Sequence, residues 1–113
     1  MRDEEKQREG RGHYKLEAWK RARELVLNVY KLTRTFPREE MFGLAAQIRR
    51  AAVSVPSNIA EGAAREGERE FAQYLNIARG SLSELETQLL IATDLGYGKA
   101  ATRCLSWSTL FRT

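Results

Sequence analysis

Two stretches decide the fold: GLAAQIRRAAVSVPSNIAEG (residues 43–62) and EFAQYLNIARGSLSELETQLLIATDLGY (residues 70–97). Both repeat apolar residues at spacings of three and four, which is typical of a helix with one buried face. In the second stretch a heptad seam holds for three repeats and consists of Phe71, Leu75, Ala78, Leu82, Leu85, Leu89 and Ala92. The glycines and charged residues between the stretches predict a turn. The pattern therefore predicts two long antiparallel helices.

Working outward from these stretches, we expect helices at residues 14–36, 38–64 and 68–95. The first ends because Pro37 disfavours helical geometry at Phe36. Pro56 removes the amide that would bond the carbonyl of Ala52, so a kink or break is expected near Val55. Residues 1–13 are charged and lack an apolar period, which predicts a disordered tail. With residues 98–113 as a short fourth helix or a divergent tail, the expected fold is an all-α, antiparallel up-and-down four-helix bundle.

Composition limits the chemistry available to the chain. Its 113 residues correspond to one domain, and 30% of them are charged. Cys104 is the sole cysteine and His13 the sole histidine, which argues against a disulfide framework, a zinc site and a Cys/His or Ser/His/Asp catalytic set. We therefore expect no enzymatic activity, no metal and no cofactor. The N-terminal segment MRDEEKQREGRGH has no apolar core, so a signal peptide is not expected and a cytoplasmic location is the default.

Charge is unevenly distributed along the chain. Residues 14–36 carry six basic and two acidic side chains, whereas residues 65–95 carry three basic and six acidic ones. A helical wheel gathers four of the basic side chains within about 80° beside the apolar arc. These four are Lys20, Arg23, Lys31 and Arg34. Such a strip fits contact with nucleic-acid phosphates, independent of base sequence. The alternative is a solvated helix face that Glu17 and Glu24 partly neutralise.

Arg49 and Arg50 are further candidates for contact with nucleic acid. Arg49 flanks the apolar seam of residues 38–64, while Arg50 points to an outer face of small and polar residues. We favour a structural role for these two arginines, namely ion pairing to Glu84 or Glu86 within or between subunits. Phosphate binding is the alternative.

The segments SNIAEG and GSLSELE carry polar residues that resemble active-site loops. Di-metal sites in bundle cores need Glu-x-x-His pairs, and we expect no histidine in any helix. Glu84 and Glu86 differ by 200° on a helical wheel and cannot share one site on their helix. Hydrogen bonds and ion pairs that set helix packing are therefore the favoured interpretation. The candidate structural or interface residues are Trp19, Arg50, Ser54, Pro56, Asn58, Glu61, Gly80, Ser81, Glu84 and Glu86.

These stretches, with YKLEAWKRARELV (residues 14–26) and the connector FPREE, closely resemble the bacterial four helix bundle protein family. Some members of that family are encoded in intervening sequences inserted in 23S ribosomal RNA genes. The resemblance covers residues 14–97 and implies an up-and-down subunit that assembles into a ring, typically a homopentamer. In the family, the residues that follow the equivalent of Gly96-Tyr97 form a fourth long helix. The sequence of residues 98–113 departs from that pattern, and a frame change in the gene is one explanation of the departure.

The resemblance extends distantly to the accessory variability determinant of diversity-generating retroelements, a basic pentameric barrel that works with a reverse transcriptase and nucleic acid. Charge and resemblance together predict a self-assembling protein that binds RNA or DNA through residues 14–36. The alternative is a protein–protein scaffold or accessory subunit, for example of a reverse transcriptase, without nucleic-acid contact.

Overall fold

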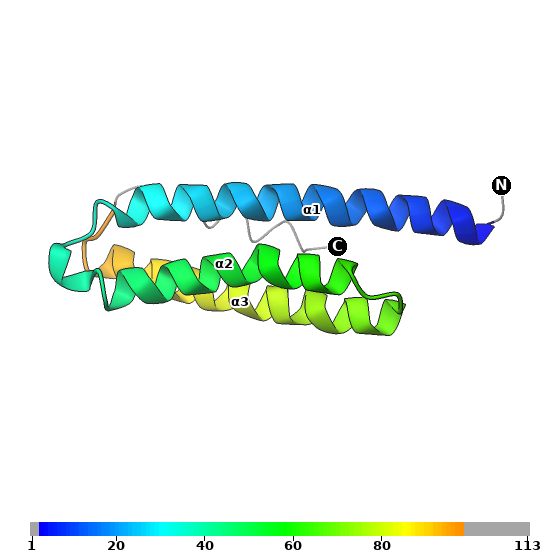
Figure 1. The fold of residues 1–113 in the computed structure, drawn as a ribbon. Helices are drawn as coiled ribbons and strands as arrows, with labels where there is room; N and C mark the ends of the chain where they lie inside the picture. The colour runs from blue at the N-terminus through cyan, green and yellow to red at the C-terminus, as the bar shows by residue number, and fades with distance from the viewer. Residues whose placement is uncertain (1–2, 99–113) are drawn as a thin grey trace.

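The computed structural model describes the backbone of residues 3–98, and the side chains of residue 12 and residues 15–98. These residues form helices α1 (Asp3–Thr33), η1 (Arg38–Glu40), α2 (Leu44–Ala63) and α3 (Glu68–Asp94), and include no strand. Successive α-helices run antiparallel (Figure 1). The predicted all-α class is therefore confirmed for the described part of the chain, while the predicted fourth element falls on residues 99–113, outside it.

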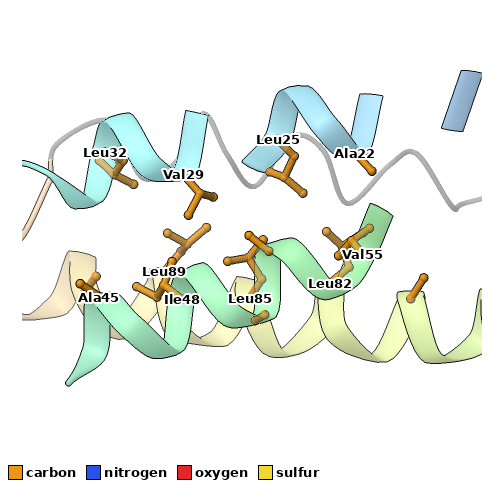
Figure 2. Packing of buried hydrophobic residues seen from close by; sticks show 14 of the residues in the cluster. Ala22, Leu25, Val29, Leu32, Ala45, Ile48, Val55, Leu82, Leu85 and Leu89 are labelled. Carbon is orange, nitrogen blue, oxygen red and sulfur yellow. The ribbon is translucent and has the colours of Figure 1, made fainter. Parts of the chain in front are cut away.

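Helix α2 packs against both other helices. The α1–α2 and α2–α3 pairs are neighbours, whereas the backbones of α1 and α3 hardly approach each other. Side chains of α1 and α3 nevertheless meet in the core: Leu25 and Val29 point toward the layer that contains Leu85 and Leu89 (Figure 2). Helices α1 and α3 thus lie diagonally across the core, on either side of α2.

The apolar spacing explains this core. The bulkiest side chains with less than 2% exposure include Leu25, Ile48, Ile59, Leu85 and Leu89, from all three α-helices. Within the predicted heptad seam of α3, every residue except Leu75 is buried. Burying one such side chain contributes about 1.5–3 kcal/mol, so this core is the main source of stability.

The N-terminal boundary differs from the prediction, because α1 begins at Asp3 and residues 3–13 are helical rather than a disordered tail. Glu, Lys, Gln and Arg dominate this segment and have good intrinsic helix propensity. Extending an existing helix also needs no new nucleus. Residues 3–13 can therefore extend the packed part of α1 as a helix although they have no periodic apolar face. The other end of α1 lies three residues before the predicted one.

The start of α2 differs from the prediction, and of the kink or break expected near Val55 the break does not occur. Residues 38–43 form a 3₁₀ turn, in which the amides of Glu40, Met41 and Gly43 donate to carbonyls three residues earlier, and α2 begins at Leu44. The helix then runs through Pro56 without a break. Pro56 is itself buried, and the Asn58 amide side chain donates to the Ser54 carbonyl at 2.8 Å. Burial of the proline ring accompanies the helix across the missing amide.

Helix α3 ends one residue before the predicted boundary, in a Schellman motif. The Tyr97 amide donates to the Ala92 carbonyl at 2.8 Å, and Gly96 adopts a φ of +83°, which favours glycine. The chain then packs against the end of α1. The rings of Tyr97 and Phe36 lie 5.4 Å apart, and a Cβ added to Gly98 would meet Leu32 at 2.6 Å. The end of α3 is thereby fixed beside the end of α1.

Candidate nucleic-acid interface

The basic strip is defined as Lys20, Arg23, Lys31 and Arg34; the first three lie on the outer face of α1, and Arg34 directly follows its last residue. All four side chains are exposed. At 1.5 Å per residue, the strip spans about 21 Å along the helix. Two apolar side chains on the same face, Leu16 and Leu27, are 48% and 59% exposed. Helix α1 therefore exposes basic and apolar side chains along its outer face, with the exposed Glu24 one turn after Lys20.

Contacts within α1 leave this charge available. The Arg23 guanidinium lies over the half-buried Trp19 ring, 4.9 Å from its centroid, which orders one member of the strip. Lys20, Lys31 and Arg34 form no ion pair with any side chain that the structure describes. The strip thus retains its positive charge with respect to those side chains.

Trp19 also lines a groove between α1 and α2. With Leu16 and Lys15 of α1 and Ile59, Ala60 and Ala63 of α2, it lines an apolar groove of about 350 Å³. It also packs against the core. Trp19 therefore joins α1 to α2, as expected of a structural aromatic residue.

Arg49 is engaged within the fold. Its Nε donates to the Thr33 hydroxyl at 2.8 Å, and its guanidinium lies 4.6 Å from the centroid of the Tyr30 ring. Thr33 is fully buried and its hydroxyl also bonds the Val29 carbonyl at 2.9 Å. Arg49 thus ties α2 to the last turns of α1, so we leave it out of the surface proposed for nucleic acid.

Arg50 is exposed and lines a polar groove of about 380 Å³ between α2 and α3. The groove is also lined by Gln47, Ala51, Ser54, Ser81 and Glu84. Within the described residues Arg50 makes no ion pair, although Glu84 lines the same groove. The pairing of Arg50 with Glu84 or Glu86 inside one chain is therefore not formed here.

The other polar candidates mostly bond within or between α2 and α3. The hydroxyls of Ser54 and Ser81 lie 2.7 Å apart and link the two helices, and the Asn58 amide donates to the Ser54 hydroxyl at 2.9 Å. Glu61 pairs with Arg65 at 3.5 Å on the surface.

Two further candidates on α3 differ in their surroundings. Glu86 is half-buried. Gly80 is exposed, and no atom lies within 4 Å of where its Cβ would be. The described chain therefore gives no packing reason for glycine at this position.

Sequence reasoning missed two buried polar residues, Thr33 and Gln88. Gln88 donates to Glu84 at 3.1 Å, but its own Oε1 is buried without a partner. The sequence pattern does not distinguish these two residues from exposed polar residues. Both lie beside apolar seam positions, and their burial depends on how the helices cross.

The perturbed pKa values lie away from the basic strip. The pKa of Arg65 is raised, chiefly because its guanidinium donates to the Tyr74 hydroxyl at 3.1 Å. Burial, followed by the neighbouring Glu40, raises the pKa of Tyr97.

The prediction that no helix contains a histidine is corrected, since His13 falls within α1. Across residues 3–98, no three His, Cys, Asp or Glu side chains gather in a way that would hold a metal ion. No helix in the same part of the chain combines the length and apolar character needed to cross a membrane.

Comparison with protein families matches residues 14–104 to the model of the 23S rRNA-intervening sequence protein. No curated protein matches the chain. The matched residues hold most of the core, the basic strip and the polar groove between α2 and α3. Because the match spans more than half of the sequence, the chain belongs to the 23S rRNA-intervening sequence protein family.

Proposed function

We propose that this chain is a non-enzymatic, self-assembling helical-bundle protein of the cytoplasm that contacts the sugar–phosphate backbone of RNA or DNA through the basic strip. The observation that carries the proposal is the exposure of four basic side chains along one face of α1 and the turn that directly follows it. Membership of a family named after sequences that interrupt 23S ribosomal RNA supports a nucleic-acid partner.

The geometry suits contact with phosphates rather than with base edges. A strip of about 21 Å covers roughly six base pairs of duplex at 3.4 Å each. Lysine and arginine side chains that reach phosphates release counterions, which gives affinity without sequence information. Binding through this surface is therefore expected to be salt-sensitive and independent of sequence.

Self-assembly would multiply this weak contact. The resemblance implies a homo-oligomeric ring, typically of five subunits, and each copy would add one basic strip. Helix α3 and the residue that follows it also expose apolar side chains that suit burial against another protein chain. These are Ile77, Leu90, Ile91 and Leu95, between 45% and 55% exposed.

The same apolar side chains favour the second candidate function, a scaffold or accessory subunit that binds a protein such as a reverse transcriptase and never contacts nucleic acid. The two functions differ in the surface that contacts the partner molecule. The basic strip lies on α1, whereas the apolar side chains lie on α3.

The test is fluorescence anisotropy with a structured RNA and a DNA duplex over a series of salt concentrations. The strip variant is Lys20→Glu/Lys31→Glu, which leaves the Arg23–Trp19 contact in place. We expect wild-type binding to weaken steeply with salt, and the variant to bind at least roughly tenfold more weakly with a shallower salt slope.

The matched control is Arg38→Glu/Arg69→Glu, which changes the net charge by the same amount at exposed positions outside α1. Equal losses in the two variants would mean that net charge alone drives binding. Absence of wild-type binding at low salt would overturn the proposal and direct attention to a protein partner.

A further inference from the structure

Phe42 is an apolar side chain that the single chain leaves almost entirely in solvent. It is 99% exposed, although phenylalanine is usually buried. Its turn is nevertheless well held, because the neighbouring Met41 packs against the core and the Gly43 amide donates to the Glu40 carbonyl at 3.0 Å. The ring therefore projects from a fixed position just before α2, where contact with another protein chain would bury it.

Phe42 begins a line of side chains along the outer side of α2, which we call the α2 patch. Its other members follow at spacings of four and three residues and share one side of the helix: Ala46, Arg50 and Val53. Arg50 is exposed, and Val53 is 40% exposed. Ser54, the next residue, lies about 100° further around the helix and bonds to a serine of α3. Most of the α2 patch is thus turned away from α3.

A second line of side chains, the α3 patch, runs along one side of α3 and past its end. Its members are separated by three, four or seven residues: Ile77, Gly80, Glu84, Ile91 and Leu95. The three apolar members are 51%, 45% and 55% exposed, in chain order. No atom lies within 4 Å of where the Cβ of Gly80 would be. Glycine is less stable than alanine inside a helix, so close approach by another chain gives a reason for glycine that the single chain lacks.

The charged members of the two patches are complementary. Arg50 makes no ion pair within the described chain, and the Glu84 carboxylate accepts a hydrogen bond from Gln88 at 3.1 Å. Their levels along the bundle also match, because each lies about one helical turn from the bond between Ser54 and Ser81, in the same direction. An arginine and a glutamate that share a level, and that no ion pair joins within the chain, suit an ion pair between copies.

The apolar members match in level in the same way. Leu44 on α2 and Ile91 on α3 are each ten residues, or about 15 Å, from the bonded serines. Phe42 comes two residues before Leu44, so it lies close to the level of Ile91 and Leu95. Burying these side chains against one another would provide the non-directional part of the association free energy, and the charges would fix the register.

We propose that the α2 patch of one copy packs against the α3 patch of the next, with Phe42 against Ile91 and Leu95 and with Arg50 donating to Glu84. Because the patches are different surfaces, the contact is head-to-tail, and each copy uses one patch toward each of two neighbours. Repetition about an axis parallel to the bundle keeps the matching levels together and closes a ring, which accommodates five subunits. The inference rests on the self-assembly proposed above and specifies its surface.

A second copy of the chain suits the α3 patch better than nucleic acid does, because Glu84 would face the phosphates. The α2 patch supplies the opposite charge and apolar side chains at matching levels within the same sequence. The basic strip lies outside both patches, so it remains available to nucleic acid in the assembly.

The experiment is sedimentation velocity over a concentration series. The proteins are wild type, Phe42→Gln, Ile91→Gln, Arg50→Glu, Glu84→Arg and the double variant Arg50→Glu/Glu84→Arg. We expect wild type to assemble into more than two copies. Each single variant should raise the concentration at half-assembly by at least about tenfold, because the altered contact recurs between all neighbours. The double variant should assemble like wild type, because the exchanged charges face each other again.

Two matched controls lie on α1, outside both patches. Leu27→Gln removes an apolar side chain that is 59% exposed, and Arg21→Glu reverses an exposed charge. Both should leave the assembly unchanged. Gly80→Leu tests the α3 patch without a charge change, since leucine favours a helix but its bulk would block close approach. Loss of assembly in Gly80→Leu, at full helix content by circular dichroism, would support the proposal.

The possible failures are distinguishable. A wild-type monomer at every concentration overturns self-assembly and this surface together, and an assembly of only two copies overturns the head-to-tail contact. An assembly that Phe42→Gln and Ile91→Gln leave unchanged, or that Leu27→Gln weakens equally, overturns the two patches and keeps self-assembly. A double charge variant that does not assemble overturns the pairing of Arg50 with Glu84. Nucleic-acid binding is measured separately by anisotropy, so its failure affects none of these results.

Discussion

Two helical glycines have opposite surroundings, although they look alike in the sequence. A Cβ on Gly62 of α2 would meet the Tyr74 Cβ at 2.8 Å and the Phe71 ring at 3.3 Å, whereas Gly80 of α3 has open space. We expect Gly62→Ala to lower the free energy of unfolding by about 1–3 kcal/mol through overpacking. Gly80→Ala should raise it by about 1 kcal/mol through helix propensity.

Urea denaturation, at a protein concentration where wild type sediments as a monomer, measures both changes. Equal effects of the two substitutions would mean that α2 and α3 do not pack closely at Gly62.

The environment of single residues was the least predictable level from the sequence. The helical wheel placed Lys20 and Lys31 beside the apolar arc, and both are exposed in the structure. Their exposure was predictable because the helical period alone decides which positions face away from the core. The Arg49 contacts with Thr33 and Tyr30 depend on where α2 crosses α1, which no local pattern encodes.

At the scale of elements, the hydroxyls of Ser54 and Ser81 form a side-chain hydrogen bond between α2 and α3. We expect each single substitution to alanine to destabilise the fold by about 1 kcal/mol, since Ser81→Ala leaves the Ser54 hydroxyl behind, and Ser54→Ala leaves both the Ser81 hydroxyl and the Asn58 amide. The double variant should lose less free energy of unfolding than the two single variants together. The difference, which is the coupling energy, should be about 0.5–1 kcal/mol.

A double-mutant cycle in urea measures this coupling, with Thr87→Ala as a control, because that hydroxyl bonds only the local Ser83 carbonyl at 3.2 Å. Additive losses would show that the two serines stabilise the fold independently.

Helix boundaries were predictable where apolar periodicity and glycine agree. Helix α3 was predicted at 68–95 and extends over Glu68–Asp94, since its seam, Gly67 and Gly96 all mark the same limits. The beginning of α1 was missed because a charged segment can be helical without burying anything. The beginning of α2 was missed because the 3₁₀ turn after Pro37 shares the short spacing of a helix.

At the scale of the whole molecule, the chain is elongated. Its extents are 55 × 21 × 18 Å, its Cα radius of gyration is 15.8 Å, and α1 extends beyond the α2–α3 pair (Figure 1). A compact domain of this length would have a radius of about 13 Å. We expect small-angle scattering of the monomer to give a radius near 16 Å. A value near 13 Å would contradict a continuous α1 that starts at Asp3.

Helix α2 is the one neighbour that α1 and α3 share within the described chain, and this has a consequence for local unfolding. If α1 detaches, the α2–α3 pair keeps its mutual packing and its serine bond. If α2 unfolds, the two remaining helices lose their shared packing surface at once. Backbone amides of α2 should therefore exchange with solvent only through nearly global opening, while those of the projecting end of α1 exchange through fraying. The hierarchy of hydrogen exchange follows from the position of one helix between two others.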